Sequence, residues 1–524
     1  MTYRVLLEFI TRVNGSNNVV ELLTNSTDPR FVETGSEQSI NITMHKGILF
    51  NINQPGNLGR GPGAHRIATE LRKNNWDIEV VDFFMYWSLD EIKQLLLSRL
   101  DDNTKFIAFG SIFAAWPDLA EDTASWVKEN YPYIVIIYGT QIYIPLKTKH
   151  IDYQFMGFAE TSVINLLKHL FSNGDPVKYK TIKGTKVITS EGSAPWKNPI
   201  IIYEDRDFVE SYEWLGVEFS RGCKFACDFC NFPILGVKGD WTRDADNFEL
   251  QLKDAYERFG VSRYVISDET FNDSTEKITK FANVVDKLNF EPFFTGFLRV
   301  DLTINRGQQE MEELSRMKMF GHFYGIESFN HKSAKAISKG MHPDKVKQGL
   351  IDIKNYFKSH NKGYYRGTIS LIAGLPHETE ESIYESYEWL KDNWQGENFV
   401  LNALEIPKAT IEQSINPLSK MTMDYSKYGY TVLKENLNSD SVNIWAQNTV
   451  PWQNEHTNYF KVQKITNEIV SDSFNYDFRL MNFHPTLFVS NTSIEEFLKI
   501  KEVELYTAAG NLAFAKNYIS KKLN

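Results

Sequence analysis

Short apolar runs alternate with amphipathic stretches between residues 46 and 171. Runs of this length predict buried strands of a parallel sheet, and the stretches between them predict helices on both of its faces. The predicted strands are Lys46–Asn51, Ile78–Phe84, Phe106–Gly110, Tyr133–Gly139 and Tyr153–Met156, and the predicted helices are Ala64–Lys73, Ser88–Leu100, Pro117–Asn130 and Thr161–Phe171. The pattern therefore predicts a Rossmann-like α/β domain, and such domains bind ligands at the carboxyl ends of their strands.

The same alternation returns in the second half of the chain, with about six further strand–helix units. Their strands are predicted at Val217–Phe219, Arg263–Ser267, Pro292–Val300, Phe320–Ile326, Tyr365–Ala373 and Phe399–Ile406. Their helices are predicted at Asn247–Phe259, Thr275–Leu288, Gln308–Met317, Ser333–Ser338 with Lys345–His360, and Glu381–Trp394. Six units predict a partial (βα)6 barrel, whose functional side chains should lie at the C-terminal strand ends.

These patterns divide the chain into five predicted parts. They are an accessory segment (1–44), the Rossmann-like domain (45–172), a linker (173–214), the barrel (215–408) and a mixed, largely helical C-terminal region (409–524). Asn14-Gly15 predicts a hairpin in the first part, and Lys183-Gly184-Thr185 predicts another in the linker. We expect the aromatic-rich C-terminal region to close the barrel mouth, with simple packing against the first domain as the alternative.

Composition restricts the classes of partner. The net charge of −10 and the isoelectric point near 5.7 argue against a nucleic-acid-binding surface, which needs a basic stripe. No apolar run reaches the roughly 18 residues of a membrane span, and the N-terminal sequence lacks the apolar core of a signal peptide. Clustered cysteines fit a reducing compartment. We expect a cytoplasmic protein with no nucleic-acid or membrane partner.

All three cysteines of the chain lie within eight residues, at Cys223, Cys227 and Cys230, with the spacing C-x3-C-x2-C. An odd number in one loop argues against a disulfide framework. A structural zinc site needs four ligands, and the nearest histidines do not have finger-like spacing. A cubane cluster also needs four iron ligands, so three thiolates leave one iron open. The spacing favours an iron–sulfur cluster, with another metal or a buried apolar cluster as alternatives.

This motif, in a loop that follows an apolar strand, resembles that of the radical S-adenosylmethionine (SAM) enzymes. The resemblance implies that Cys223, Cys227 and Cys230 hold a catalytic [4Fe-4S] cluster whose fourth iron binds the amino and carboxylate groups of SAM. One electron then cleaves SAM to a 5'-deoxyadenosyl radical. It also implies a reducing partner such as flavodoxin or ferredoxin.

The resemblance assigns SAM contacts to the ends of the barrel strands. Asp268 and Glu269 match the family's acidic run after the second strand, with helix capping, which we expect mainly from Asp273, as the structural alternative. Arg299, after the third strand, would hold the SAM carboxylate or pair with a carboxylate of the core. Glu327, in Gly-Ile-Glu-Ser after the fourth strand, would contact SAM.

Three further SAM contacts are predicted by the same resemblance. Phe229, inside the cysteine motif, would lie near the adenine or cover the cluster. Ser370 lies on the fifth strand, and Gly374 in the following Gly-Leu-Pro turn would let the backbone approach the adenine or ribose. Glu378 and Glu380 are expected at the N-terminus of the next helix.

The Rossmann-like domain resembles the cobalamin-binding domain that precedes many radical SAM barrels. Its Gly-rich loop, residues 55–63, fits neither a dinucleotide fingerprint nor a P-loop. The resemblance implies cobalamin contacts at Asn57, Leu58, Gly59, Ser111, Gly139, Thr140 and Glu160. His65 does not fit the family's Asp-x-His-x-x-Gly motif, so we expect no histidine ligand to cobalt. The alternative is a domain that has lost its ligand and only packs on the barrel.

Together the two domains resemble class B radical SAM methylases, over residues 46–408. The resemblance implies that one SAM methylates the corrin cobalt, while another generates the radical that activates a substrate carbon. The substrate would be a small molecule or a peptide. Two alternatives stay open: a non-methylating rearrangement or cyclisation with the same cofactors, and a non-catalytic sensor that binds the cluster and cobalamin. The absence of further cysteines argues against relatives with a second cluster.

Overall fold

The computed structural model describes residues 44–52, 59–111, 117–140, 143, 146–189, 200–230, 241–407, 419–433, 449–479, 493–499 and 508–524. The chain divides into two compact units, Met1–Thr43 and Met44–Asn524. The hairpin predicted at Asn14-Gly15 lies outside the described residues.

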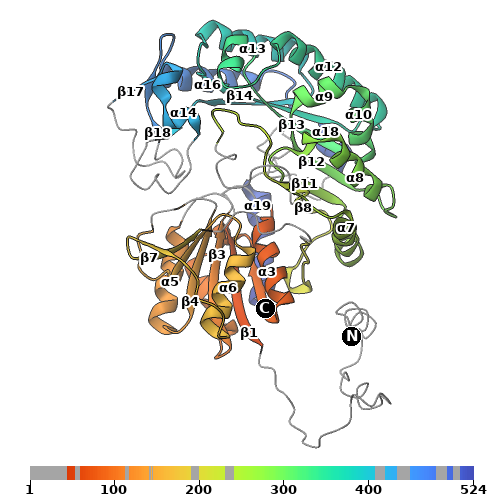
Figure 1. Ribbon diagram of the computed structural model, residues 1–524. Helices are drawn as coiled ribbons and strands as arrows, with labels where there is room; N and C mark the ends of the chain where they lie inside the picture. The colour runs from red at the N-terminus through yellow and green to blue at the C-terminus, as the bar shows by residue number, and fades with distance from the viewer. Residues whose placement is uncertain are drawn as a thin grey trace, which may run out of the picture. The chain divides into compact units, whose positions relative to one another are not determined.

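The N-terminal domain is built on a seven-stranded sheet with the order β2-β1-β3-β4-β5-β7-β6 (Figure 1). Five parallel strands confirm the sequence prediction: β1 (His45–Ile52), β2 (Trp76–Val81), β3 (Thr104–Ser111), β4 (Val135–Thr140) and β5 (Tyr153–Met156). The strands carry mostly apolar residues because helices cover both faces of the sheet. Their carboxyl ends therefore form one edge at which a ligand can bind.

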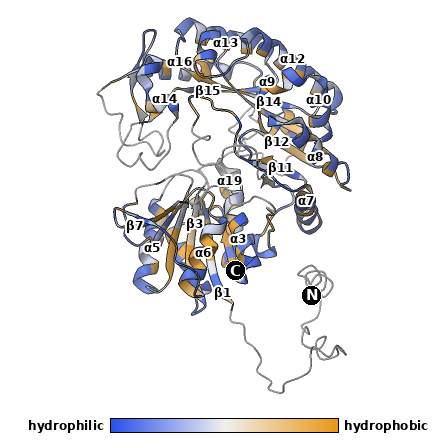
Figure 2. Ribbon diagram, in the orientation of Figure 1, coloured by the Kyte–Doolittle hydropathy of each residue, from blue (hydrophilic) through white to orange (hydrophobic). Residues whose placement is uncertain are grey.

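Two sets of helices cover this sheet. On one face, α3 (Pro62–Lys73) and α6 (Glu160–Phe171) share an apolar cluster with the strands. On the other face, α4 (Leu89–Arg99) and α5 (Asp118–Asn130) pack with the C-terminal helix α19 (Ala508–Leu523). Figure 2 shows the strands as the most apolar parts of this domain, as expected for a sheet buried between helices. Helix α19 thus completes the N-terminal domain, which was the alternative expectation for the C-terminal region.

The hairpin predicted around Gly184 is confirmed. It joins β6 (Lys180–Ile182) to β7 (Thr185–Thr189) through Lys183 and Gly184, both of which have positive φ. Strand β7 also pairs in parallel with β5. The sheet thus continues through residues that the sequence pattern had assigned to a linker.

The second sheet is the predicted partial barrel, with six parallel strands in the order β15-β14-β13-β12-β11-β8. The strands are β8 (Trp214–Val217), β11 (Arg263–Ile266), β12 (Phe293–Leu298), β13 (Met319–Glu327), β14 (Arg366–Ala373) and β15 (Asn398–Ala403). The outer helices are α7 (Ala245–Phe259), α8 (Thr275–Val285), α9 (Val300–Arg306), α10 (Gln308–Arg316), α11 (His331–Ala336), α12 (Pro343–His360) and α13 (Glu380–Asn393) (Figure 1). This order leaves β8 and β15 as the two edges of the sheet.

One barrel helix was missed by the sequence pattern. The third strand was predicted to run to Val300, but β12 ends at Leu298 and α9 starts at Val300. The backbone N–H of Arg299 donates to Asn272 Oδ1 at 2.8 Å, and Asn272 Nδ2 donates back to the carbonyl of Arg299 at 2.9 Å. This side chain satisfies the backbone of Arg299 at the point where the strand ends.

The C-terminal region is divided between the two domains. Helix α16 (Tyr459–Ser473) packs against α13, where Tyr387 donates to Asp472 at 2.9 Å. Helix α18 (Ile494–Lys499) contacts the barrel, because Arg366 donates to the carbonyl of Phe497 at 3.0 Å. Packing against the N-terminal domain, the alternative given for this region, holds for α19, and closure of the barrel mouth stays a prediction. In the part of the chain that the structure describes, every helix is too short or too polar to cross a membrane.

A buried charge network joins the Gly-rich loop to the segment before the barrel. The Arg60 guanidinium donates to Asp82 at 2.5 Å, to Glu213 at 2.7 Å and to the carbonyl of Asp207 at 2.8 Å. Nε2 of His65 lies 3.0 Å from the same Asp82 carboxylate. Burial acts to raise the pKa of Asp82, but His65 and Arg60 outweigh it and hold this pKa well below its usual value. The network therefore holds Arg60, in the Gly-rich loop, in the interior of the molecule.

Candidate functional site

The three cysteines lie on the loop that follows β8, at a C-terminal strand end as predicted. The loop begins after the short strand β9 (Ser220–Arg221). This strand pairs antiparallel with β10 (Trp241–Thr242), which follows the cysteines in sequence. Cys223, Cys227 and Cys230 are all partly exposed, and the N–H of Cys230 donates to the carbonyl of Cys227 at 3.1 Å. The three thiols are therefore accessible to a ligand at the barrel mouth.

Arg299 contacts this loop directly. Its Nη1 lies 3.6 Å from Sγ of Cys227, and its guanidinium carbon lies 3.8 Å from the centre of the Phe225 ring. The other side of the guanidinium donates to both carboxylate oxygens of Asp301, at 3.0 and 2.8 Å. Arg299 thus pairs with a carboxylate of the protein, which was one of its two predicted roles, and also places a positive charge beside a cysteine.

Glu327 lies at the end of β13 with a positive φ of 70°. This conformation is strained for a residue with a side chain, and such strain occurs most often at functional sites. Its carboxylate is buried 3.6 Å from Lys339 Nζ, and Lys339 also donates to the carbonyl of Gly325 at 2.7 Å. A Cβ atom at Gly325 would lie 2.6 Å from Oε1 of Glu327. The glycine in Gly-Ile-Glu-Ser therefore leaves the space that the carboxylate occupies.

Burial raises the pKa of Glu327, and the nearby cations Lys339 and Arg299 act against this rise. The same arginine that contacts Cys227 is thus close enough to influence Glu327. The structure therefore places Arg299 and Glu327 together, close to the loop that carries Cys227. Their predicted contacts with SAM stay predictions.

The two acidic residues after β11 have different surroundings. Asp268 accepts from the N–H of Phe219 and from the hydroxyl of Ser220, both at 2.7 Å, so both of its carboxylate oxygens bond the protein. Burial raises the pKa of Asp268 to about 6. Glu269 accepts one bond, from the N–H of Gly222 at 3.2 Å, and burial raises its pKa to about 7. Glu269 is the better placed of the two to meet a ligand at the cysteine loop, whereas Asp268 holds the strand end in place.

The expected cap of the next helix was wrong by one residue. The N-cap of α8 is Ser274, whose side chain accepts from the N–H of Lys277 at 3.1 Å. Asp273 instead forms an ion pair with Lys277 Nζ at 2.6 Å. The sequence contains two adjacent residues that can cap a helix, and the buried lysine selects the carboxylate for a charge pair.

The turn after β14 is held by a buried carboxylate. Gly374 has a φ of 91°, and its N–H and that of Leu375 donate to Glu378 at 2.8 and 3.1 Å. Helix α13 is capped by Thr379, so the expectation that Glu378 serves the helix N-terminus was wrong, while Glu380 does lie in its first turn. The structure thus explains the Gly-Leu-Pro turn without a ligand, and the predicted approach of SAM to Gly374 stays a prediction.

The surroundings of the two other predicted SAM contacts, Ser370 and Phe229, say little about their roles. Ser370 is half-buried on β14, in register with Gly325 on one side and Val400 on the other. Phe229 packs against the apolar core of the barrel. Both positions are compatible with their predicted roles and test neither of them.

Glu378 offers a test of this turn through its pKa, which burial raises to about 7. In the unfolded chain the carboxyl has a pKa of about 4.3, so between these values the folded protein binds more protons. Its contribution to stability is therefore complete below about pH 4.3 and is lost as the pH rises to about 7, a difference of roughly 3–4 kcal/mol.

We expect Glu378→Gln, which keeps an acceptor for the turn, to remove this part of the pH dependence. Denaturant unfolding of both proteins across that pH range measures it, since the difference between their free energies of unfolding should change with pH. Parallel pH profiles would contradict the buried, protonated carboxyl.

The N-terminal domain presents small residues at its strand ends. A Cβ atom added at Gly110 or Gly139 would meet its nearest neighbours only at 3.8 and 3.7 Å, so both strand ends leave room at the carboxyl edge. The predicted cobalamin contacts Ser111, Gly139 and Thr140 lie at these ends, and Gly59 precedes α3. Asn57 and Leu58 lie outside the described residues. Small residues at these strand ends are compatible with a ligand at this edge. His65, on α3, is buried beside Asp82.

Glu160 connects the two domains. It begins α6 and accepts a hydrogen bond from Arg221, the residue that precedes Gly222 and Cys223. The Arg221 guanidinium also lies 3.9 Å from the centre of the Phe158 ring. Burial acts to raise the pKa of Glu160, but Arg221 and Arg66 together with a backbone hydrogen bond outweigh it and lower this pKa. Sequence reasoning missed this pair, and the only signal for it is an arginine directly before the cysteine motif.

The cysteine loop does not present a preformed metal cage. Within the described residues, no three His, Cys, Asp or Glu side chains lie close enough together to hold a metal ion. The donor set itself fits a thiolate-ligated cluster, because three partly exposed thiols share one short loop beside a cation.

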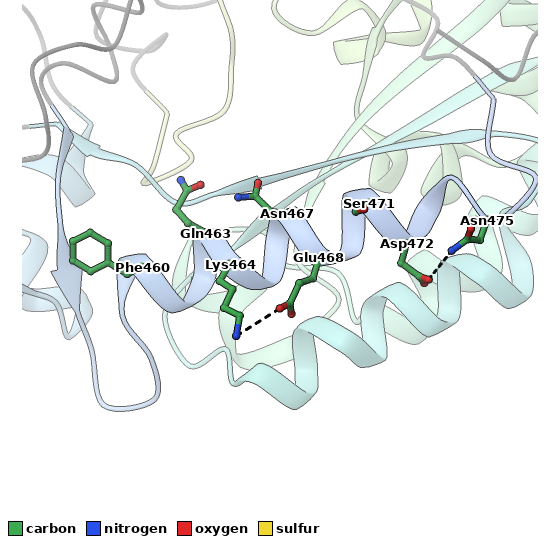
Figure 3. A pocket seen from close by; sticks show the side chains of 8 residues that line it. All are labelled: Phe460, Gln463, Lys464, Asn467, Glu468, Ser471, Asp472 and Asn475. Atoms are coloured by element: carbon green, nitrogen blue, oxygen red, sulfur yellow. Dashed lines mark hydrogen bonds and ion pairs between the residues drawn. The ribbon is translucent and has the colours of Figure 1, made fainter. Parts of the chain in front are cut away.

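One described hollow lies away from these residues. It is open, has a volume of about 760 Å³ and runs along α16, lined by side chains between Phe460 and Asn475 (Figure 3). Its three charged side chains already have partners, since Lys464 pairs with Glu468 and Asp472 accepts from Asn475. This hollow contains none of the predicted site residues.

Comparison with protein families gives the assignment. Residues 217–390, from the end of β8 to α13, match the family described as the Radical SAM superfamily. The barrel is a radical SAM domain. Its match includes the three cysteines and every SAM contact predicted on the barrel strands. No curated protein sequence matches the chain.

Solved structures share the fold of both domains. The cobalamin-dependent SAM radical enzyme OxsB, with aqua-cobalamin and SAM bound, has a TM-score of 0.52 and 13% identity, over 74% of this chain and 56% of OxsB. The radical SAM methyltransferase TsrM from Kitasatospora setae has a TM-score of 0.64 and 10% identity, over 91% of this chain and 98% of TsrM. The chain thus spans just over half of OxsB and nearly all of TsrM. At these identities the likeness shows the fold alone: a Rossmann-like α/β domain joined to a radical SAM domain.

Proposed function

We propose that this chain is a cobalamin-dependent radical SAM enzyme that methylates an unactivated carbon of a small molecule or peptide. The observation that carries the proposal is the ion pair between Glu160 and Arg221, which connects the strand-end edge of the N-terminal domain to the start of the three-cysteine loop. The near-complete overlap with the structure of the radical SAM methyltransferase TsrM supports the methyl-transfer part.

The residues present fit the proposed cofactors. Cys223, Cys227 and Cys230 would hold a [4Fe-4S] cluster, and the carboxyl edge of β1, β3 and β4 would hold cobalamin without a histidine ligand. When bound, the cluster supplies the electron that cleaves SAM, and the corrin supplies a carrier for the methyl group.

The side chains at the barrel mouth would bind and orient SAM. The carboxylates of Glu327 and Glu269 are partly or fully buried with raised pKa values, so an incoming ammonium group would stabilise their charged forms. Arg299 lies between the cysteine loop and Glu327 and can pair with a carboxylate or reinforce a thiolate. These contacts would gain strength from the exclusion of water at the mouth.

Two other functions use the same residues. A rearrangement or cyclisation would need the same cluster, SAM and corrin, and OxsB shows only that the fold occurs in a cobalamin-dependent SAM radical enzyme. A sensor without turnover would need the cofactors but no access for a substrate. The products formed from SAM separate these possibilities.

We expect the anaerobically purified protein, incubated with hydroxocobalamin and desalted, to retain the visible absorbance of a corrin. After iron and sulfide reconstitution, we expect reductant and SAM to yield S-adenosylhomocysteine together with 5'-deoxyadenosine, measured by liquid chromatography and mass spectrometry. Deoxyadenosine without S-adenosylhomocysteine would contradict methylation and favour a rearrangement. Neither product, from protein that carries both cofactors, would favour the sensor.

A further inference from the structure

Asp228 lies between the second and third cysteines and is held from two sides. Its N–H donates to the carbonyl of Ile337 at 3.4 Å, and its carbonyl accepts from the N–H of Met421 at 2.9 Å. Its carboxylate accepts from Lys420 Nζ at 2.8 Å and from the Tyr428 hydroxyl at 3.0 Å. The residue at the centre of the C-x3-C-x2-C motif is therefore bonded to the C-terminal region of the chain, about 190 to 200 residues away in sequence.

Three partners of Asp228, namely Lys420, Met421 and Tyr428, belong to one short stretch, residues 419–430, which we name the clamp segment. It contains the helix α14 (Lys420–Met423) and the 3-10 turn η7 (Tyr425–Tyr428). Both of its ends are anchored in the barrel core, since Met421 and Tyr430 are buried at 3% and 2% exposure. A segment that is fixed by apolar burial at both ends can hold a loop in place.

The clamp segment also contacts the opposite side of the barrel mouth. The Tyr430 hydroxyl donates to the carbonyl of Gly374 at 2.8 Å, in the turn that follows β14. The cysteine loop follows β8, which is one edge of the sheet, and β14 is the neighbour of β15, which is the other edge. The two edges are not paired with each other in a partial barrel. The clamp segment therefore joins strand ends that the sheet leaves apart.

We propose that the clamp segment positions the cysteine loop across the open side of the barrel, with Asp228, Lys420 and Tyr428 as positioning residues for the cluster. The proposal rests on the proposed function in one respect, that the three cysteines hold a cluster. It adds that the C-terminal region determines how firmly the loop holds that cluster.

The contacts are strong enough to order a loop and too weak to govern folding. Lys420 is 61% exposed and Asp228 15%, so solvent weakens this pair and it contributes little to global stability. The Tyr428 hydroxyl adds one further hydrogen bond to the same carboxylate. Removing both should therefore loosen the loop locally while the protein stays folded.

The test uses a double variant, Lys420→Ala with Tyr428→Phe, which leaves the cysteine loop itself unchanged. The matched control is Lys427→Ala with Tyr425→Phe, which removes the same charge and the same hydroxyl from the same segment. Lys427 is exposed, and the N–H of Lys427 bonds Asp424. Equal melting temperatures of the two double variants establish that both remain folded.

The first measurement is hydrogen–deuterium exchange on the metal-free protein, followed by mass spectrometry of peptides that cover residues 222–230. We expect these amides to exchange several-fold faster in the clamp variant than in the wild type or the control. Equal exchange in all three proteins would overturn the clamp, and this result does not depend on any cofactor.

The second measurement is the rate at which a strong iron chelator removes the reconstituted cluster under anaerobic conditions, followed by visible absorbance. We expect several-fold faster loss from the clamp variant than from the control. Faster amide exchange with unchanged cluster loss would overturn the positioning role. If the wild type forms no cluster at all, the proposed function fails, and the exchange measurement still decides whether the clamp exists.

Discussion

Cys227→Ala is expected to abolish cluster assembly, so that the reconstituted variant lacks the visible absorbance of thiolate-ligated iron and retains almost no iron. The chain has three cysteines, all in one loop, so no fourth thiol can replace the missing ligand. A cubane with only two protein thiolates leaves two irons open and should not survive desalting. Iron and acid-labile sulfide per chain, measured after reconstitution and desalting, give the result directly.

The matched control is Ala226→Ser, one residue away, where the side chain is exposed. This variant should assemble the cluster as the wild type does, because it keeps all three thiols and the backbone contacts of the loop. A Cys227→Ala protein with unchanged iron and absorbance would contradict the assignment of the ligands. Loss of iron in both variants would indicate a damaged loop and would require the metal-free melting temperatures for comparison.

Arg60→Leu is expected to lower the free energy of unfolding by about 3–5 kcal/mol, because it leaves buried carboxylates without their cation. The side chains of Arg60 and Asp82 have 0% exposure and that of Glu213 has 1%, and the guanidinium is shared between the two carboxylates. Burial acts to lower the pKa of Arg60, but Glu213 and Asp82 outweigh it and raise this pKa well above its usual value. The arginine is therefore charged in the folded protein. Denaturant unfolding of the metal-free protein measures the loss.

Arg316→Leu is the control for this prediction. Arg316 pairs with Asp286 and Glu313 at the surface, where its side chain is 37% exposed, so its loss should cost less than about 1 kcal/mol. If Arg60→Leu proved no more damaging than Arg316→Leu, the buried network would not be an ion network. Because Arg60 lies within the Gly-rich loop, its loss should also weaken the proposed binding of a corrin.

The order and type of the elements in both α/β domains could be predicted from the sequence. Strands such as β1 and β14 are buried along most of their length because helices cover both faces of a parallel sheet, and their apolar runs leave a clear local signal. The hairpin at Gly184 was predictable for a similar local reason, since its turn requires positive φ.

The location of the C-terminal helices could not be predicted in the same way. Helix α19 completes the N-terminal sheet, where the Tyr518 hydroxyl accepts from the N–H of Asp82 at 2.9 Å, across 436 residues of sequence. Its amphipathic pattern indicates that one face is buried but does not identify the partner surface.

The sequence could predict where the residues of the candidate site lie, but it could not predict which groups their side chains contact. The cysteine spacing placed the loop correctly at the end of β8, and Arg299 and Glu327 lie near it as expected. The role of Glu378 differs from the expectation, because it bonds the backbone of the preceding turn and not the helix N-terminus. Asp268 bonds the N–H of Phe219 and the hydroxyl of Ser220, and its contact with SAM stays a prediction. Acidic residues at strand ends have the same sequence signature whether they bind a ligand or hold a turn.

The central claim is that the cysteine loop and the strand-end groups of the radical SAM domain cleave SAM reductively. The most direct test is the formation of 5'-deoxyadenosine by the anaerobically reconstituted, dithionite-reduced protein with SAM, compared with Cys227→Ala under the same conditions. The account predicts deoxyadenosine from the wild type and none from the variant. A wild-type protein with an intact cluster that forms no deoxyadenosine would contradict it.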